Sequence, residues 1–394
     1  MRLQSRNTVL ILFLFFMYVL FQVVQSSELA LLLNISFIRE IFMFLLIVVS
    51  TLFVIPIVFK KNIFFYLIFI FLVLFTNAII TRQFILLLNF LVIVALSNMV
   101  SKVDLILYAN AAALIIGICI VLLLFWLGVI PARSIIQNDR LRHFLGFNLP
   151  VILPNLYATF VTYYAFIKKE DINIVVLILL AVPSFIIMNF TDGRQNFFTL
   201  ILMIGLLVVS KCLKKEKIVN ILYYSNLLLF FGGIFVSIFA AAFYYSLPFL
   251  REWDFFFTGR FSWFALAWEN FPIRLLGNNV AGHMVRINID NLYLQLLLRG
   301  GVIIFAIFIY VMITLLKHYK ENKDNTALVI SIIMFIASLV SPGWMPIWRN
   351  VLLFTLPGIL SERNSIKEAK QMESINLSSI KDVPPLGINL IKNQ

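Results

Sequence analysis

The chain has 394 residues, of which 62% are hydrophobic and only 12% charged, and its formal net charge is +13. Long apolar runs with few charges are typical of membrane-spanning proteins and exclude an ordinary soluble globular domain. Two cysteines and three scattered histidines form neither a disulfide framework nor a zinc motif. The sequence therefore predicts no metal site, and its basic charge indicates membrane topology rather than nucleic-acid binding.

Twelve apolar segments are predicted as membrane-spanning helices. Spans must be helices or closed barrels because lipid offers the backbone no hydrogen-bond partners, and these runs are too long and too uniformly apolar for barrel strands. In chain order they are 8–24, 41–59, 63–80, 84–101, 106–130, 149–167, 172–191, 197–213, 218–247, 292–316, 326–341 and 344–360. The predicted fold is all-α, a polytopic integral membrane domain over residues 1–360. The first segment also has features of a signal peptide, but we expect it to be retained.

The distribution of lysine and arginine favours one topology. Arg2 and Arg6 precede the first segment and indicate a cytoplasmic N-terminus. All 16 lysines then fall on the cytoplasmic side. The external side carries 12 basic residues, and every one is arginine: Arg39, Arg82, Arg133, Arg140, Arg142, Arg194, Arg251, Arg260, Arg274, Arg286, Arg299 and Arg349. The polar tail 361–394 is predicted to be cytoplasmic and partly disordered.

The external arginines need a second explanation, because the positive-inside rule accounts only for the lysines. Arginine is an always-charged, bidentate partner of phosphate. The alternative is that these residues are snorkelling anchors and loop ion pairs, which explains Arg39 and Arg82 most easily. Lysine is completely absent from the external side, which favours the first explanation: this face handles a phosphate-bearing anion at the bilayer surface.

The external loop 248–291, between the ninth and tenth segments, is the longest connection and holds nine ionisable residues, Arg251, Glu252, Asp254, Arg260, Glu269, Arg274, His283, Arg286 and Asp290. Long structured loops are usually functional. Within it, Phe261, Phe264, Ala265 and Trp268 share one helical stripe. That pattern predicts a helix lying in the membrane interface. The alternative is a lid that packs on the bundle.

Several residues in and around this loop are candidates for chemistry. Asp290 and Asn291 precede the tenth segment, where Asp290 also suits a helix N-cap. His283 is an isolated loop histidine, which is more often without a catalytic role. The turn TDGR places Arg194 between the seventh and eighth segments, close to the long loop.

At these residues the sequence resembles the Wzy-type polysaccharide polymerases, in the superfamily that includes the O-antigen ligases. The family pattern is an arginine followed by Trp and Ala in an amphipathic helix, then Pro and Gly, then His-Asn or Asp-Asn, Tyr-Leu and Gly. Here these positions are Arg260, Trp263, Ala267, Pro272, Gly277, Asp290, Asn291, Tyr293, Leu294, Gly300 and Gly301. The ligases tend to have His where this chain has Asp290, which favours a polymerase.

The resemblance implies a reaction between two repeat-unit oligosaccharides carried on undecaprenyl pyrophosphate, at the external face of a bacterial cytoplasmic membrane. A hydroxyl of one glycan would attack the anomeric carbon of the other, and undecaprenyl pyrophosphate would leave. No cofactor is implied, and the partners would be the lipid bilayer, a chain-length regulator and a flippase. The implied residues are Asp290, Glu269 and His283 for proton removal, Arg260, Arg194, Arg286 and Arg274 for the pyrophosphate, and Asn291, Tyr293, Trp263 and Arg299 in support.

Two other functions fit part of the sequence. A ligase would use the same chemistry with a different acceptor. A lipid-linked oligosaccharide flippase or a two-times-six carrier would match twelve spans. Against transport, the connection between the sixth and seventh segments is only KKED, and charged residues are missing from the interiors of the segments.

Overall fold

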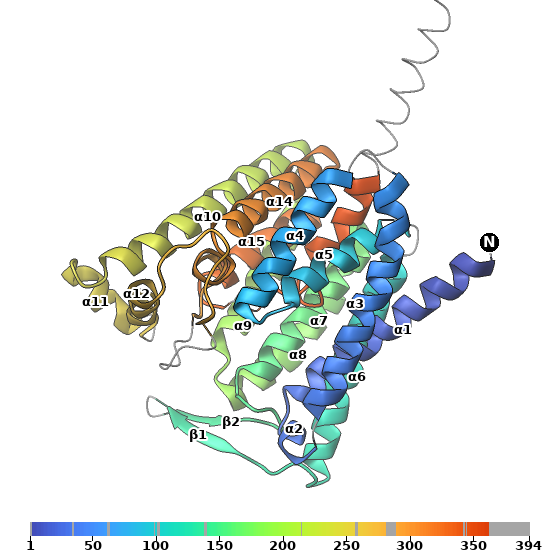
Figure 1. Ribbon diagram of the computed structural model, residues 1–394. Coiled ribbons are helices and arrows are strands. Elements are labelled where there is room, and N and C mark those ends of the chain that lie inside the picture. Colours follow the sequence, from blue (N-terminus) through green and yellow to red (C-terminus); the bar gives the residue numbers. More distant parts are fainter. Residues whose placement is uncertain are drawn as a thin grey trace, which may run out of the picture.

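The computed structural model describes residues 2–33, 35–60, 64–97, 99–100, 103–137, 140–213, 215–256, 259–280, 289–341, 343 and 345–361. Over these ranges the chain is mostly helical (Figure 1), in agreement with the predicted all-α class. His283, Arg286 and the tail after Ser361 lie outside the described residues.

The helices follow one another with short connections. In the N-terminal half the elements are α1 Arg2–Gln25, α2 Leu29–Leu32, α3 Ile35–Lys60, α4 Phe64–Thr81, α5 Ile85–Leu96, α6 Val103–Trp126, β1 Ser134–Gln137, β2 Arg140–His143, α7 Ile152–Lys168 and α8 Ile174–Thr191. In the C-terminal half they are α9 Arg194–Cys212, α10 Lys215–Phe243, α11 Pro248–Phe256, α12 Arg260–Asn270, α13 Leu292–Leu294, the π-helix Gln295–Gly300, α14 Val302–Glu321, α15 Asn325–Ser338 and the 3₁₀ helix Val351–Thr355.

Six described helices are long and apolar enough to cross a bilayer, judged by length and composition. They are Ile35–Val54, Val103–Trp126, Ile174–Thr191, Arg194–Cys212, Glu216–Phe243 and Val302–Glu321. Other predicted spans are shorter: α5 has 12 residues, or about 18 Å, against a hydrocarbon thickness of about 30 Å. The predicted count of twelve spans is therefore supported only in part.

The exterior and the centre of the bundle differ in the way a lipid environment requires. Large apolar side chains stand outward on the helices, among them Phe65, Trp126 and Leu228 at 80%, 81% and 75% exposure. A surface with this much contiguous apolar area is suited to lipid rather than water. By contrast, α15 is buried along almost its whole length and contacts α7, α9, α10 and α14. A helix enclosed by protein need not match the thickness of the membrane.

Charge separates along the bundle. At the end where α1 and α6 finish, Arg133 pairs with Glu28 at 3.2 Å. At the end where α10 begins and α14 finishes, Lys323 pairs with Glu216 at 2.8 Å. We call these the arginine end and the lysine end. Among the described residues, the predicted separation of arginine from lysine is thus reflected in where their ion pairs form.

The predicted twelfth span, 344–360, is not a continuous helix, and this prediction was wrong in its form. Residues 345–350 are irregular, and regular helix begins only at the 3₁₀ turn Val351–Thr355. Irregular backbone is tolerated at membrane depth only where protein or a water-filled cavity satisfies its polar groups. Here the irregular segment runs inside the bundle, where side chains of the surrounding helices supply the missing hydrogen bonds.

Asparagine and tyrosine side chains hold this irregular segment. Asn89 of α5 donates to the Met345 carbonyl at 2.8 Å and accepts from the Ile347 amide at 2.9 Å. Asn110 of α6 donates to the Trp348 carbonyl at 3.0 Å. Further helices reach the segment in the same way, with the hydroxyl of Tyr163 donating to the Ile347 carbonyl at 3.2 Å. Hydropathy alone predicted a helix here because it cannot register these long-range bonds.

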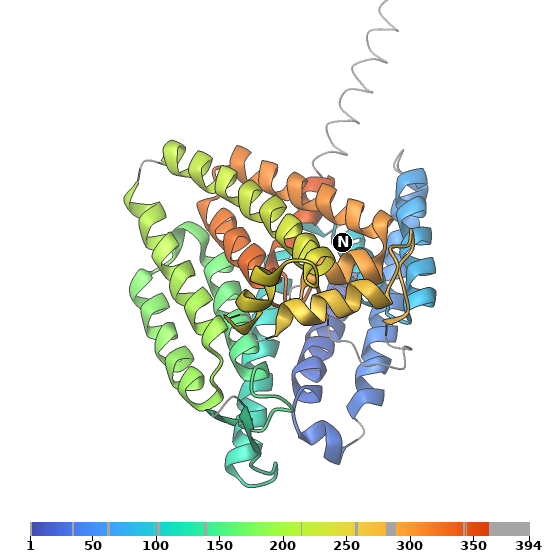
Figure 2. The same cartoon turned by 90° about the vertical axis from the view of Figure 1, so that its left-hand side faces the viewer.

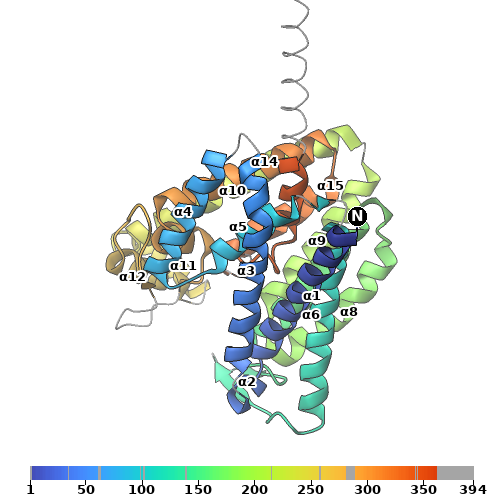
Figure 3. The same ribbon diagram turned by 45° about the vertical axis from the view of Figure 1, so that its right-hand side comes forward.

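Two further features shape the arginine end. A two-stranded antiparallel hairpin, β1–β2, projects beyond the helices and pairs Ile135 with Arg142 (Figure 1); it was not predicted. Seen from the side of α11 and α12 (Figure 2), these short helices lie across the end of α10. On the other side of the molecule α1 packs between α3 and α6 (Figure 3).

Candidate active site

The turn between α8 and α9 gathers three arginines around one aspartate. Asp192 takes the left-handed conformation that ends α8, with φ 54°, and Arg194 is the first residue of α9. The Asp192 carboxylate accepts a hydrogen bond from Nε of Arg194 at 2.7 Å. It also pairs with Arg142 at 3.0 Å and Arg140 at 3.5 Å. One carboxylate therefore faces three guanidinium groups, and two positive charges remain unbalanced.

The hairpin supplies two of these arginines. Successive side chains of a strand point to opposite faces, so residues two apart share a face. Arg140 and Arg142 of β2 are two apart and both reach Asp192. Sequence analysis did not select them as site residues. The sequence feature that could have indicated them is the alternation in RLRH, residues 140–143, which on a strand presents both arginines to the same side.

A second pair of charges adjoins this group. Arg260 begins α12 and Asp290 lies shortly before α13. Burial lowers the pKa of Arg260; the charge of Asp290 opposes this shift and that of Arg142 adds to it. Burial likewise raises the pKa of Asp290, and Arg260 opposes that shift. Arg260 therefore interacts electrostatically with both Asp290 and Arg142. We call Arg140, Arg142, Arg194, Arg260, Asp192 and Asp290 the arginine cluster.

The predicted residues Arg260 and Arg194 thus belong to one group, although they lie far apart in the chain. Asp192 pairs with both Arg194 and Arg142, and the charge of Arg142 acts on Arg260. Four arginines and two aspartates leave a net charge of +2. Guanidinium groups bind phosphate and pyrophosphate through paired N–H donors.

Arg260 is positioned by a carboxylate that sequence analysis did not select. Gly259 precedes α12 and offers no side-chain cap. Instead Asp254, buried at the end of α11, accepts hydrogen bonds from the Phe261 amide at 2.7 Å and the Ser262 amide at 3.2 Å. The Tyr244 hydroxyl donates to the same carboxylate at 3.0 Å. Asp254 therefore satisfies the open amides at the start of α12 and fixes the position of Arg260.

Replacing Asp254 with alanine should destabilise the protein by about 1–2 kcal/mol, the usual cost of a lost N-cap. Asp254→Asn keeps a hydrogen-bond acceptor and should lower the free energy of unfolding by clearly less than Asp254→Ala. Thermal unfolding of the detergent-purified variants measures both. An alanine variant as stable as the wild type would show that α12 does not depend on this cap.

The apolar stripe of α12 packs into the protein. Phe261, Phe264 and Ala265 are buried, and Trp268 is packed against the same apolar cluster. The helix lies on α10, so the alternative of a lid on the bundle describes the structure better than an interfacial helix. The exposed aromatic residues are instead Trp263, on the outer side of α12, and those of α11.

Two glycines lock the loop after α12 to the start of α14. Gly277 and Gly301 have φ of 83° and 89°, conformations that favour glycine. A Cβ on Gly301 would lie 2.4 Å from the Gly277 amide nitrogen. Asn77 of α4 secures the contact by donating to the carbonyls of Leu276 at 2.8 Å and Gly300 at 3.0 Å. These glycines of the family-like pattern therefore have a structural role.

Two predicted supporting residues also hold the fold. Asn291 caps α13, accepting from the Leu294 amide at 2.9 Å, and donates to Ser237 at 2.8 Å and to the Leu339 carbonyl at 3.0 Å. It lines a cavity of about 80 Å³ together with Arg260. Tyr293 is 1% exposed and packs against α10, where it supports the bundle rather than facing the arginine cluster.

Other predicted residues lie outside the cluster. Glu269 is exposed nine residues after Arg260, about 13 Å further along α12. The Arg274 side chain is exposed, while its carbonyl accepts from the Val302 amide at 3.0 Å. Arg299 is half-buried in the π-helix. Of the three candidates for proton removal, the structure places Asp290 beside the arginines and Glu269 away from them, and His283 is not described.

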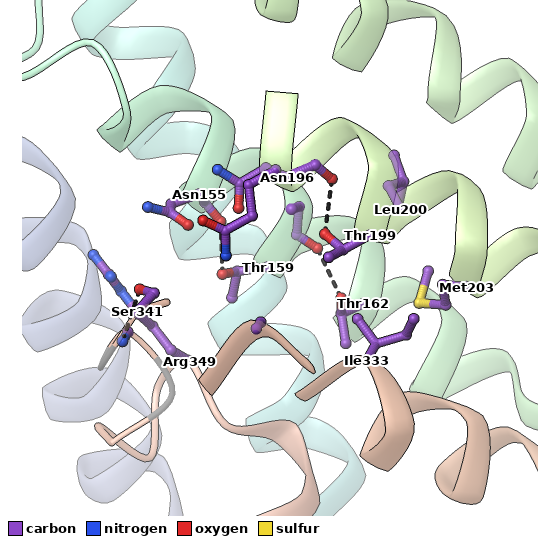
Figure 4. Close-up of a pocket in the computed structure, with 14 residues that line it drawn as sticks. Asn155, Thr159, Thr162, Asn196, Thr199, Leu200, Met203, Ile333, Ser341 and Arg349 are labelled. Carbon is purple, nitrogen blue, oxygen red and sulfur yellow. Dashed lines mark hydrogen bonds between the residues drawn. The ribbon is translucent and has the colours of Figure 1, made fainter. Parts of the chain in front are cut away.

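A polar cavity lies inside the bundle (Figure 4), and two of its lining residues, Gln195 and Asn196, directly follow Arg194 in what we call the arginine turn, residues 191–194. Its lining residues come from α7, α9, α15 and the irregular segment: Asn155, Ala158, Thr159, Thr162, Gln195, Asn196, Thr199, Leu200, Met203, Ile333, Ala337, Ser341, Gly343 and Arg349. Sequence analysis missed it. The signal was a polar stripe at helical spacing, at 155, 159 and 162 on one helix and 196 and 199 on another.

The pKa of Asp290 gives a prediction about pH. Because its folded pKa is raised, the folded state holds the proton more tightly than the unfolded state, and stability contributed by this group falls as pH rises through that pKa. Asp290→Asn should remove that fall. We expect an unfolding temperature at neutral pH equal to or above that of the wild type, with the difference vanishing in acid. If Asp290→Asn unfolded at a lower temperature than the wild type at neutral pH, burial would not be what dominates the pKa of Asp290.

Comparison with known proteins finds no matching family model, no matching curated protein and no matching solved structure.

Proposed function

We propose that the protein is a polysaccharide polymerase that joins undecaprenyl-pyrophosphate-linked repeat units. The observation that carries the proposal is the arginine cluster, in which Arg140, Arg142 and Arg194 surround Asp192 next to Arg260 and Asp290. Three of these arginines come from segments far apart in the sequence. Such a group can bind a pyrophosphate with several bidentate contacts at once.

The proposed reaction assigns separate roles to the two halves of the cluster. The arginines hold the donor pyrophosphate and stabilise the charge that develops as it leaves. A hydroxyl of the acceptor glycan attacks the anomeric carbon of the donor; a new carbon–oxygen bond forms, and the bond to the pyrophosphate oxygen breaks. Asp290 accepts the hydroxyl proton. Its raised pKa makes it a better general base than an ordinary carboxylate.

The proposed setting is the external face of a bacterial cytoplasmic membrane, with the arginine end outward and both termini cytoplasmic. The positive-inside rule supports this orientation, because it places the lysine end inside. The lipid carrier would enter from the bilayer. A flippase and a chain-length regulator of the same pathway would be the protein partners, and the reaction as written needs no cofactor.

Gel analysis of surface glycan in a deletion strain tests the proposal. Single repeat units on the final acceptor are expected, and a wild-type copy should restore the polymer ladder. Polymer that accumulates on the lipid carrier, without transfer, would favour a ligase. Repeat units trapped on the cytoplasmic side of the membrane would favour a flippase and would overturn the proposed polymerase.

Transport is the second candidate, because of the interior cavity. A charged side chain inside a membrane bundle often marks a substrate or ion pathway, and Arg349 lines the polar cavity between α7, α9 and α15. The sequence had indicated no such charge within the segments. The same deletion strain separates this candidate from the polymerase by the side on which repeat units accumulate.

A further inference from the structure

The polar cavity of Figure 4 is closed on most sides and lies within the bundle. Its volume is about 20 Å³, enough for a single water-sized species, since one water needs about 10–15 Å³ measured in this way. Phosphate or a sugar would require the helices to separate. Any ligand of the cavity as it stands is therefore monatomic or of similar size.

The charge of the cavity is positive. Arg349 is the ionisable residue in its wall, and the 14 lining residues include no Asp or Glu. The buried Nε of Arg349 has no hydrogen-bond partner among the described residues. The guanidinium lies 4.5 Å from the ring centre of Trp348, a contact that eases the burial of a cation but does not neutralise it. A buried charge without an opposite charge is costly, so the site favours an anion.

The N-terminal turns of two helices, α7 and α9, also border the cavity. Asn155 lies in the first turn of α7, and Gln195 and Asn196 lie in the first turn of α9. The cavity also extends along both helices as far as Thr162 and Met203, so the helix dipoles contribute only where it borders these first turns. Gly193 holds them together, because a Cβ at this position would lie 2.5 Å from the Pro154 ring. The net positive charge of the cavity wall comes from Arg349.

The other polar groups of the wall are hydroxyls and side-chain amides. Thr159 donates to the Asn155 carbonyl at 2.8 Å, and Thr199 donates to the Asn196 carbonyl at 3.0 Å. These bonds fix the threonine side chains on their own helices and use their hydroxyl protons, so the threonines offer no donor to an anion. The amide groups of Asn155, Gln195 and Asn196 remain as neutral donors in the wall, and neutral amides with one guanidinium form a donor set for an anion.

We propose that this cavity binds one chloride-sized monovalent anion, which neutralises Arg349 inside the bundle. The proposal is independent of the proposed polymerase activity. It also explains how Arg349 is tolerated in the irregular segment without a carboxylate in the cavity wall. Because Gln195 and Asn196 directly follow Arg194, an anion bound here would also stabilise the arginine turn.

Thermal unfolding of the full chain, purified in detergent, tests the site. Chloride is titrated against gluconate at constant ionic strength, and a hundredfold excess over its Kd should raise the unfolding temperature by a few degrees. Bromide should act like chloride, and phosphate should not. Equilibrium binding of radioactive chloride should saturate at one ion per chain. An unfolding temperature equal in chloride and gluconate, without saturable binding, would overturn the proposal.

Substitutions of cavity residues test whether the ion binds beside Arg349. Arg349→Gln should lose the response to chloride, while Arg82→Gln, on an exposed arginine outside the cavity, should keep it. Asn155→Asp supplies a carboxylate in the wall and should be stable in gluconate with no response to chloride. This second variant keeps the test decisive if Arg349→Gln does not fold. A full chloride response in both Arg349→Gln and Asn155→Asp would exclude the cavity.

Discussion

Arg260→Ala is expected to reduce polymer formation by about 10²–10³-fold, the effect of removing one preorganised donor to a developing negative charge. Arg260 is half-buried, and the charges of Asp290 and Arg142 both act on it. An incoming water could not replace it, because a water carries no charge and no bidentate fork. The measurement is the length distribution of surface glycan in a deletion strain that carries the variant, at equal protein level.

Controls separate catalysis from folding in this experiment. Arg82→Ala removes an exposed arginine outside the cluster and should leave the polymer ladder unchanged. Removal of Arg260 also leaves Asp290 half-buried without its partner, so Arg260→Ala combined with Asp290→Asn should recover stability but not polymer. A normal ladder from Arg260→Ala would exclude Arg260 from the site.

Gly301→Ala is expected to destabilise the protein by at least about 3 kcal/mol, because two costs add. At φ 89° and ψ 169° the backbone lies in a region that is essentially restricted to glycine, which costs about 1–3 kcal/mol for other residues. The new Cβ would also lie 2.4 Å from the Gly277 nitrogen and 2.5 Å from the Leu275 carbonyl oxygen. Relief of these contacts would break the lock between the loop and α14. Size-exclusion profile and unfolding temperature in detergent measure the effect.

Gly232→Ala is the matched control. Gly232 lies within α10, and a Cβ at this position meets nothing within 4 Å. Alanine in a helix interior is favoured over glycine by up to about 1 kcal/mol, so this variant should equal or exceed the wild type in stability. If Gly301→Ala behaved like Gly232→Ala, the close approach of the two backbone segments would not exist in solution.

Three sets of contacts hold the loop after α10 in place and thereby position Arg260 and Asp290. Asp254 caps α12 from one side, and the pair of Gly277 and Gly301 ties the other end of the loop to α14. Asn291 joins α13 to α10 and α15. Side chains that must keep their geometry during a reaction need such support from packed elements.

Several features of the protein follow from the sequence by itself. Helix α6 and helix α8 were predicted as apolar segments because length and hydropathy are local properties, and both are found as helices. Lysine and arginine were separated by counting segments, and the ion pairs at the two ends follow the same division. Arg194 and Arg260 were selected from short motifs; Arg194 pairs with Asp192, the charge of Arg142 acts on Arg260, and their role as a site stays a prediction.

Other features depend on contacts between distant segments, which no local pattern contains. Arg142 reaches Asp192 only because a hairpin folds back over the end of α8. The stripe of α12 turns inward because α10 offers an apolar surface for it. Hydropathy along one segment does not tell lipid from a protein neighbour, since both are apolar.

The irregular segment shows the same limit most clearly. Its sequence is apolar enough to be predicted as the twelfth span, yet residues 345–350 form no helix. Asn89 and Asn110, on α5 and α6, replace the lost backbone hydrogen bonds, and Arg349 is carried into the bundle. Composition by itself determined that this protein is helical and apolar. Only the tertiary structure decided where its backbone could leave the helix, because that depends on which distant side chains satisfy the exposed amides and carbonyls.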